Sequence, residues 1–183
     1  MKTTTFILML AAGVWGAATN GAEPAVGKTP SERVGVYDSR VVAFAHFWSD
    51  QGRTERDALV AEARAAKVAG DTKQLNECER AIKEAQERSH LQVFSSAPAD
   101  EALAALKDRL PAIEQELGVA RLVSKWDEQA LQGIPEANRV DATDRLAREF
   151  NPDEKRLKTI EPMKKSKPVP LDEVRRLIKA GKI

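Results

Sequence analysis

Asp38, Ser39 and Arg40 are the residues of this chain whose types and spacing come nearest to a reactive group, because a carboxylate, a hydroxyl and a guanidinium are adjacent. They interrupt an otherwise apolar stretch at residues 33–48. Ser39 and Asp38 could act as nucleophile and base only if their side chains met, but neighbouring strand residues point to opposite faces. We therefore favour a structural role for the triplet, as an ion pair or a helix cap, over a catalytic one.

The residues on either side of the triplet predict a strand followed by a helix. Before it, Val34, Val36 and Tyr37 are typical of a short strand. After it, apolar residues recur at the i, i+3, i+4, i+7 spacing of a helix, which are Val41, Phe44, Ala45 and Trp48. Asp38 or Ser39 then occupies the N-cap position, where a side-chain oxygen accepts from the first helical amides.

The remaining reactive side chains predict no catalytic, cofactor or metal site. His46 and His90 have no partner at metal-ligand spacing, and no nucleophile elbow or phosphate-binding loop is present. We expect His46 to be a hydrogen-bonded structural residue and His90 to be solvated. Cys78 is the only cysteine, so we expect a small core residue and no intramolecular disulfide. The sequence thus indicates a protein that is not an enzyme.

Residues 53–92 predict an antiparallel hairpin of two helices. Gly70 suits the end of the first helix, and Asp71 or Thr72 suits the N-cap of the second. The apolar positions are Leu59, Ala63 and Ala66 in the first helix, and Leu75, Cys78, Ile82 and Ala85 in the second. Because this stripe is narrow and rich in alanine, it is typical of a two-helix coiled coil that projects into water.

The later part of the chain predicts a heptad helix and two more strands. Leucines recur at coiled-coil spacing at Leu103, Leu106 and Leu110, and Pro111 must kink or divide that helix. We expect strands near 33–38, 119–125 and 139–141, and a last short helix that ends at residues 151–152. The predicted class is α+β, mainly α, with a small β element and a projecting helical hairpin.

The N-terminal end of the sequence resembles a secretory leader. Lys2 precedes an apolar run from Phe6 to Ala18, and small residues follow it. We predict a signal peptide at residues 1–22, cleaved after Ala18 or Ala22, and hence export across the inner membrane into the periplasm.

The charges divide the chain into an acidic body and a basic tail. Residues 23–154 hold 18 Lys or Arg against 25 Asp or Glu, and residues 155–183 hold 10 against 3. We predict that residues 153–183 form a tail with a linker at 163–170 and a short amphipathic helix at 171–180. A helix of this length is marginal in isolation, so it must dock on this body, on a neighbouring subunit or on another partner. Attraction to the acidic body, its own or a neighbour's, is the simplest choice. Contact with a membrane surface is an alternative. The tail has no aromatic residue that could stack on bases, so we expect no nucleic-acid partner.

Three stretches of the chain resemble the Skp (OmpH-like) family of periplasmic chaperones. They are RVGVYDSRVVA at 33–43, LGVARLVSKWD at 117–127 and VDATDRLAREF at 140–150. The resemblance covers about residues 33–151, and we assign an OmpH-like domain to residues 23–152. It implies a trimer whose strands form a central body, with helical hairpins around a cavity that shelters unfolded outer-membrane proteins. The hairpin is shorter than in these chaperones, and the acidic body and basic tail depart from the family pattern.

Two functions stay open at this point. The first is a chaperone-like or scaffolding protein without cofactor that binds unfolded or envelope proteins, with Leu59, Ala63, Leu75 and Ile82 in the hairpin seam. The second is a small secreted enzyme or ligand-binding domain, with a pocket near Tyr37, Asp38 and Arg40 at the strand ends.

Overall fold

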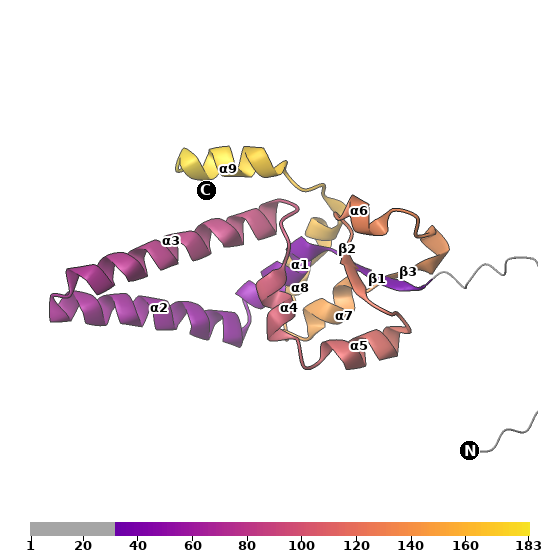
Figure 1. Ribbon diagram of the computed structural model, residues 1–183, viewed down its shortest axis with the longest axis horizontal. Helices are drawn as coiled ribbons and strands as arrows, with labels where there is room; N and C mark the ends of the chain where they lie inside the picture. The colour runs from indigo at the N-terminus through magenta and orange to yellow at the C-terminus, as the bar shows by residue number, and fades with distance from the viewer. Residues whose placement is uncertain (1–31) are drawn as a thin grey trace, which may run out of the picture. The chain divides into compact units, whose positions relative to one another are not determined.

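A computed structural model describes residues 32–183, and helices make up most of them (Figure 1). The predicted signal peptide at 1–22 and the next residues, 23–31, lie outside the described residues. The described part is mainly helical with a small sheet, which confirms the prediction of a mainly α protein with a small β element. Within residues 32–183, no helix is both long enough and apolar enough to cross a bilayer.

The sheet has three strands in the order β2-β1-β3, and β1 is its centre. β1 (Val34–Tyr37) pairs in parallel with β2 (Leu122–Ser124) on one side and with β3 (Arg139–Asp141) on the other. The strands lie where the sequence predicts them, although β2 is shorter than the predicted 119–125. Because parallel strands end at the same edge of a sheet, the residues after β1, β2 and β3 come together at one edge.

Three helices follow β1 in succession, namely α1 (Ser39–Phe47), α2 (Asp50–Ala69) and α3 (Thr72–Phe94). Gly70 ends α2 in the left-handed conformation, at φ 71°. Asp71 caps α3, because its carboxylate accepts from the backbone N of Gln74 at 3.0 Å. α2 and α3 therefore turn back on one another, and Figure 1 shows them diverging from this turn toward α1.

The contact between α2 and α3 is narrow. Ala66 and Cys78 are buried in it, and the thiol of Cys78 is free, which fits a small core residue. The predicted seam residues Leu59, Ala63, Leu75 and Ile82 are only partly buried. Small side chains are thus buried in this contact, and larger apolar side chains along it remain incompletely covered.

The predicted heptad helix is divided, which is one of the two outcomes expected from Pro111, whereas its coiled-coil seam is wrong. The chain forms two short helices instead, α4 (Asp100–Ala105) and α5 (Leu110–Leu117), and Pro111 lies in the first turn of α5. Leu106 lies between them and is fully buried in the main core, against which Leu103 and Leu110 pack. These leucines therefore belong to the interior of the domain and form no coiled-coil seam.

In the main core, α1 packs against helices that come later in the chain. Its residues come from α1, from the region of α4 and α5, from α7 (Thr143–Arg148) and from α8 (Glu154–Lys165). A smaller cluster around Val34, Val123 and Leu131 lies beside the sheet, where α6 (Glu128–Leu131) and the 3-10 turn η1 (Glu136–Asn138) connect β2 to β3. We call the sheet together with α1 and α4–α8 the base of the molecule. α1 is thus the helix around which this base is packed.

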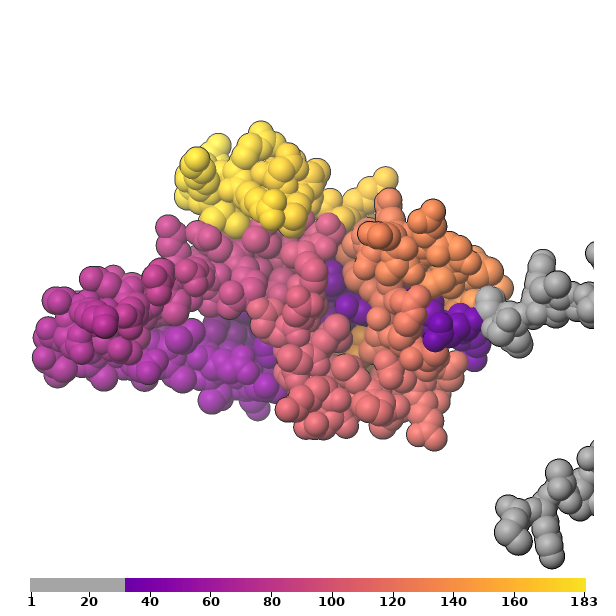
Figure 2. All heavy atoms as spheres, viewed as in Figure 1, coloured from indigo at the N-terminus to yellow at the C-terminus, as the bar shows by residue number. Residues whose placement is uncertain are grey.

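The segment predicted as a basic tail is part of the fold. α8 was not predicted, and it includes the first three residues of the predicted 163–170 linker, so the extended connection begins only at Ser166. α9 (Leu171–Lys179) corresponds to the predicted helix at 171–180. It lies along α3 in Figures 1 and 2, where Val174 is fully buried and the backbone N of Val169 donates to the carbonyl of Phe94 at 2.9 Å.

Ion pairs contribute to the docking of α8, but they do not explain the docking of α9. Lys164 of α8 pairs with Asp144 at 2.9 Å and with Glu161 at 2.8 Å. In the described part of the chain, none of the cations of α9 forms an ion pair. The apolar side of α9 therefore holds it in place.

The packing of α8 predicts a strong effect of mutating its buried face. Ile160 is 1% exposed and Leu157, on the same helix, is 42% exposed. We expect Ile160→Ala to lower the free energy of unfolding by about 2–5 kcal/mol, because it leaves a cavity. Leu157→Ala should change it by less than about 1 kcal/mol. Urea denaturation followed by circular dichroism measures both, and equal effects would mean that α8 is not part of the core.

Candidate functional site

Asp38 connects β1 to α1 by capping the helix. Its Oδ1 accepts from the backbone N of Arg40 at 3.1 Å, and its backbone N donates to Oγ1 of Thr143 at 3.0 Å. The first bond satisfies an amide at the N-terminus of α1, and the second attaches the start of α7. The predicted role of the triplet as a helix cap is therefore observed, with Asp38 as the capping residue.

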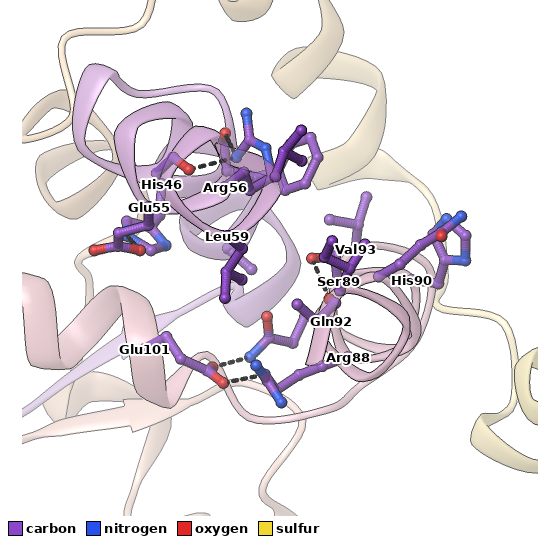
Figure 3. A pocket seen from close by; sticks show the side chains of 17 residues that line it. His46, Glu55, Arg56, Leu59, Arg88, Ser89, His90, Gln92, Val93 and Glu101 are labelled. Atoms are coloured by element: carbon purple, nitrogen blue, oxygen red, sulfur yellow. Dashed lines mark hydrogen bonds and ion pairs between the residues drawn. The ribbon is translucent and has the colours of Figure 1, made fainter. Parts of the chain in front are cut away.

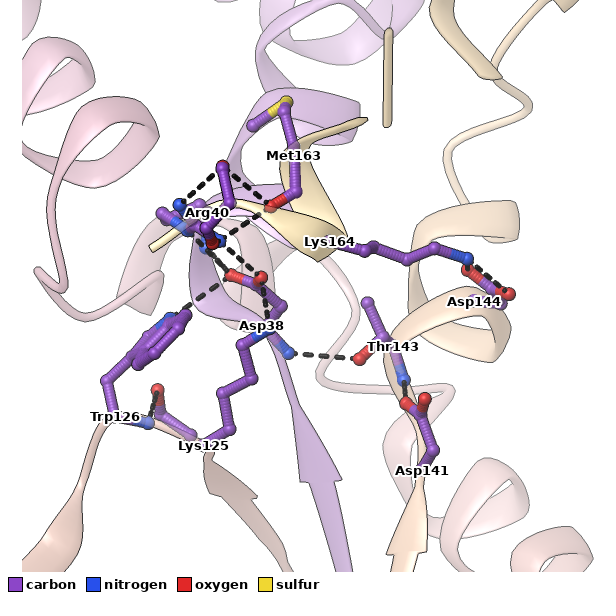
Figure 4. Close-up of polar contacts among 11 residues, drawn as sticks. Asp38, Arg40, Lys125, Trp126, Asp141, Thr143, Asp144, Met163 and Lys164 are labelled. Carbon is purple, nitrogen blue, oxygen red and sulfur yellow. Dashed lines mark hydrogen bonds and ion pairs between the residues drawn. The ribbon is translucent and has the colours of Figure 1, made fainter. Parts of the chain in front are cut away.

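Asp38 and Arg40 also form a buried ion pair. Nη2 of Arg40 lies 2.9 Å from Oδ2 of Asp38, and the two side chains are 3% and 1% exposed. The guanidinium reaches past Asp38 to the C-terminal end of α8, where it donates to the carbonyls of Met163 at 2.7 Å and Ser166 at 2.8 Å (Figure 4). One side chain thus joins the β1–α1 corner to α8.

Two residues that follow β2 complete this cluster, and the sequence did not single them out. Nζ of Lys125 lies 2.6 Å from Oδ2 of Asp38, and Nε1 of Trp126 donates to Oδ1 at 3.1 Å. The Trp126 ring also lies beneath the charges of Arg40 and Lys125, at 4.9 Å and 4.5 Å from its centroid. The signal that could have found them is the parallel pairing of β1 with β2, since it places both strand ends at one edge.

The surroundings of Asp38 exclude an acid, base or nucleophile at the triplet. Burial alone would raise the pKa of Asp38, but the hydrogen bonds and charges of Arg40 and Lys125 outweigh it and lower the pKa. The carboxylate therefore stays ionised at neutral pH, and both of its oxygens are engaged. The Ser39 hydroxyl is fully buried and has no hydrogen-bond partner within residues 32–183, so no base can activate it.

A cleft opens between α2 and α3 close to the end of α1. Its volume is about 400 Å³. Its walls are mainly apolar and consist of Leu59 and Val60 of α2 and Ile82, Ala85 and Val93 of α3. In Figure 3, Leu59 projects from α2 into the space between the helices, and the polar side chains lie around its margin.

A close approach of α1 and α2 fixes one wall of the cleft. A Cβ on Gly52 would lie 2.3 Å from the carbonyl oxygen of His46, so only glycine fits there. Ser49 caps α2 by accepting from the N of Gly52 at 3.0 Å, and its hydroxyl donates to His46 O at 2.7 Å. Arg56 donates to the carbonyls of Gly52 and Phe47, and its guanidinium lies 3.9 Å from the centroid of the Phe47 ring. These contacts hold α2 against the end of α1.

His46 lines this cleft, and the prediction that it is fully hydrogen-bonded is wrong. Its Nε2 is buried without a hydrogen-bond partner in the described part of the chain and lies 3.8 Å from Oε2 of Glu55. The ring packs against Phe150, with centroids 5.3 Å apart. Burial lowers the pKa of His46, and the charges of Glu55 and Glu101 oppose that shift only in part. The imidazole is therefore neutral at pH 7.

The opposite margin of the cleft is an ordered polar network. Arg88 forms an ion pair with Glu101, and Nε2 of Gln92 donates to Oε2 of Glu101 at 2.5 Å and to the carbonyl of Pro98 at 2.9 Å. His90 is partly buried beside Phe94, with ring centroids 5.8 Å apart, so it is less solvated than predicted. This margin connects α3 to α4.

A second hollow of about 660 Å³ lies at the ends of β1 and β2. Its lining is more polar and includes Tyr37, Asp100, Arg121, Trp126 and Asp127. Burial, with the nearby charges of Asp100 and Asp127, raises the pKa of Tyr37 to about 12, so its hydroxyl stays protonated. Residues 32–183 contain no group of three or more His, Cys, Asp or Glu that could hold a metal ion.

The Asp38 carboxylate predicts a large loss of stability when its charge is removed. Asp38→Asn keeps a capping oxygen but leaves the charge of Arg40 buried without its partner, so we expect a loss of about 3 kcal/mol in the free energy of unfolding. Asp153→Asn is the matched control, because Asp153 also caps a helix and pairs with an arginine, but at the surface. It should cost less than about 1 kcal/mol in the same urea titration. Similar losses in both variants would contradict a special role for the buried pair.

The same carboxylate predicts a pH dependence of stability. Because folding lowers the pKa of Asp38 below its ordinary value of 3.8, its ionisation stabilises the fold at neutral pH. This contribution is lost as the pH falls below about 4 and through the folded pKa. The difference in unfolding free energy between the wild type and Asp38→Asn, measured from pH 7 downward, should therefore shrink in acid. A difference that grew below about pH 4 would contradict the lowered pKa.

Comparison of the chain with protein-family models, with curated proteins and with solved structures finds no match. Its function must therefore be argued from the geometry of the cleft, the second hollow and the Asp38 cluster.

Proposed function

We propose that this protein is a non-enzymatic, chaperone-like binding protein that holds an apolar segment of a non-native polypeptide in the cleft between α2 and α3. The observation that carries the proposal is the cleft itself, with about 400 Å³ of space between apolar side chains of both helices. Binding sites of this size are common among proteins. The guest is a polypeptide segment because the cleft is an open groove between two helices, which a chain can enter and leave.

The energy for such binding comes from covering the walls of the cleft. Leu59 and Ile82 face the cleft and are only partly buried. Burying a Leu, Ile or Phe side chain of a guest is worth about 1.5–3 kcal/mol. One or two guest side chains would therefore give the weak, reversible binding that a holding chaperone needs.

The polar cluster at Asp38 supports a binding role over catalysis. Its carboxylate accepts from Arg40, Lys125 and Trp126, and its pKa is lowered. These contacts use the donors and acceptors that a reaction would need. We therefore assign the cluster to holding the base together and the cleft to binding.

The wider proposal places the protein with the OmpH-like chaperones that three of its stretches resemble. It would then be exported to the periplasm, assemble as a trimer and bind unfolded envelope proteins. The order of strand, helix pair and later strands supports it. Its particular features would be the helices α8 and α9, which pack against α1 and α3. Sedimentation of the mature chain tests the trimer, and a strict monomer would remove this part of the proposal.

The second hollow favours a second candidate function, that of a small-ligand-binding domain. The hollow runs along β2 and reaches the carboxyl ends of β1 and β2, where parallel sheets often bind ligands. The hydroxyl of Tyr37, Arg121 and two aspartates would then contact a small polar molecule. Loss of ligand binding in Arg121→Gln would favour this candidate, and retention of peptide binding in the same variant would keep the two sites separate.

The cleft predicts that a polar substitution of its wall weakens peptide binding. Leu59→Gln should raise the Kd of a fluorescein-labelled apolar peptide about tenfold, which corresponds to a loss of about 1.4 kcal/mol. Val68→Gln is the control, since Val68 lies on the same helix, is 90% exposed and does not line the cleft. Fluorescence anisotropy measures both, with thermal melts to confirm folding. Equal Kd values for the wild type and Leu59→Gln would refute binding in this cleft.

A further inference from the structure

We propose that the segment bound in the cleft carries a basic residue, whose ammonium or guanidinium group binds between Glu55 and Nε2 of His46. This inference rests on the proposed function, because it concerns the chemistry of the guest in the same cleft. It specifies a guest in which apolar residues stand next to a lysine or arginine.

The first reason is that two polar groups on this side of the cleft can still form hydrogen bonds. Nε2 of His46 is buried without a hydrogen-bond partner within residues 32–183. Glu55 accepts one hydrogen bond, to Oε1, from Nε2 of Gln51 at 3.1 Å. No lysine or arginine of the described chain forms an ion pair with Glu55. A positively charged donor would form a charge-assisted hydrogen bond with this carboxylate and would also give the buried imidazole a partner, so it would bind here more strongly than a neutral donor.

The second reason is that the cations of the cleft are already engaged. Arg56 donates to two backbone carbonyls and lies against the Phe47 ring. Arg88 is paired with Glu101 across the opposite margin. Neither guanidinium forms an ion pair with Glu55, so the carboxylate is free to pair with a cation of the guest. The charge of Arg56 acts on both Glu55 and His46 and offsets part of this attraction. An acidic guest would be repelled here, and a basic one attracted.

The third reason is geometric. Nε2 of His46 and Oε2 of Glu55 are 3.8 Å apart, which is too far for a hydrogen bond between them. Nε2 of His46 has no exposed surface, whereas the Glu55 side chain is 55% exposed. When the groups that cover Nε2 move aside, a nitrogen between the two atoms can lie about 2.7–3.2 Å from both, and an ammonium has three donors to offer. Leu59 follows Glu55 by one helical turn, so it lies on the same side of α2. The aliphatic stem of a lysine could then pack along Leu59 while its charge reaches Glu55.

The net charge of the fold does not select the guest. Residues 23–154 hold 18 basic against 25 acidic side chains, but the docked segment 155–183 holds 10 against 3, so the two totals are equal. A preference for a basic residue must therefore come from groups of the cleft such as Glu55 and His46. The experiment includes a second acidic residue of α2 as a control for this.

Three labelled peptides of identical apolar sequence test the proposal, with lysine, norleucine or glutamate at one central position. Their Kd values are measured by fluorescence anisotropy at pH 8, where His46 is neutral, and at about 0.15 M salt. We expect the lysine peptide to bind about fivefold more tightly than the norleucine peptide, and the glutamate peptide to bind least well. Norleucine matches the stem of lysine without its charge, so the ratio isolates the ammonium group.

Two variants of α2 locate the preference. Glu55→Gln should bring the Kd values for lysine and norleucine together. Glu62→Gln removes the same charge from an exposed position on the same helix outside the cleft, and it should leave the ratio unchanged. If both variants reduced the ratio equally, the preference would come from net charge and the proposed contact would be overturned.

The outcomes distinguish this inference from the proposed function. If the lysine and norleucine peptides bound equally well to the wild type, the basic-residue contact would be overturned and binding of apolar segments would stand. If none of the three peptides bound, both proposals would fall. Binding of the lysine peptide with a preference over norleucine that is lost in Glu55→Gln and kept in Glu62→Gln supports both.

Discussion

The buried ion pair between Asp38 and Arg40 is the interaction on which the arrangement of the base depends. Removing two charges from water costs several kcal/mol for each ion, unless every donor and acceptor finds a partner. Here Asp38 lies at the N-terminus of α1, and Arg40 reaches the carbonyls at the C-terminus of α8. The helix dipoles favour a negative charge at the first place and a positive charge at the second. The pair is therefore stabilised by both helices as well as by its own attraction, and it joins them.

The position of the cleft follows from this corner through a short chain of local contacts. α1 runs only from Ser39 to Phe47, so the cap at Asp38 fixes where its far end lies. At that end, Ser49 and Gly52 attach the first turn of α2 to the carbonyl of His46. The direction of α2 is thus set by its start, and its contact with α3 is set near Gly70. Between the start of α2 and the contact near Gly70, the two helices cover each other least, and the cleft lies there.

Local signals in the sequence predicted the strands, the cap at Asp38 and the turn at Gly70, because each depends on a few neighbouring residues. The leucines around Leu106 were assigned to a coiled-coil seam because a buried core helix and a helix of a coiled coil have the same spacing of apolar residues. α8 was missed because it buries mainly Ile160, carries many charges and contains Pro162 near its end. The contacts of Lys125 and Trp126 with Asp38, and the unpaired Nε2 of His46, arise from tertiary packing. No local pattern encodes them.

The way α3 is covered supports the proposal that the cleft binds a guest. α9 packs along α3 and buries Val174, so the fold uses its C-terminal helix to cover apolar surface there. Only small residues, Ala66 and Cys78, are buried in the contact of α3 with α2. A coiled coil selected only for stability would close over Leu59 and Ile82 as well, since covering apolar surface yields about 25 cal/mol per Å². Instead Gly52 and Arg56 hold α2 at a position that leaves these side chains open, and that free energy remains for a guest to gain.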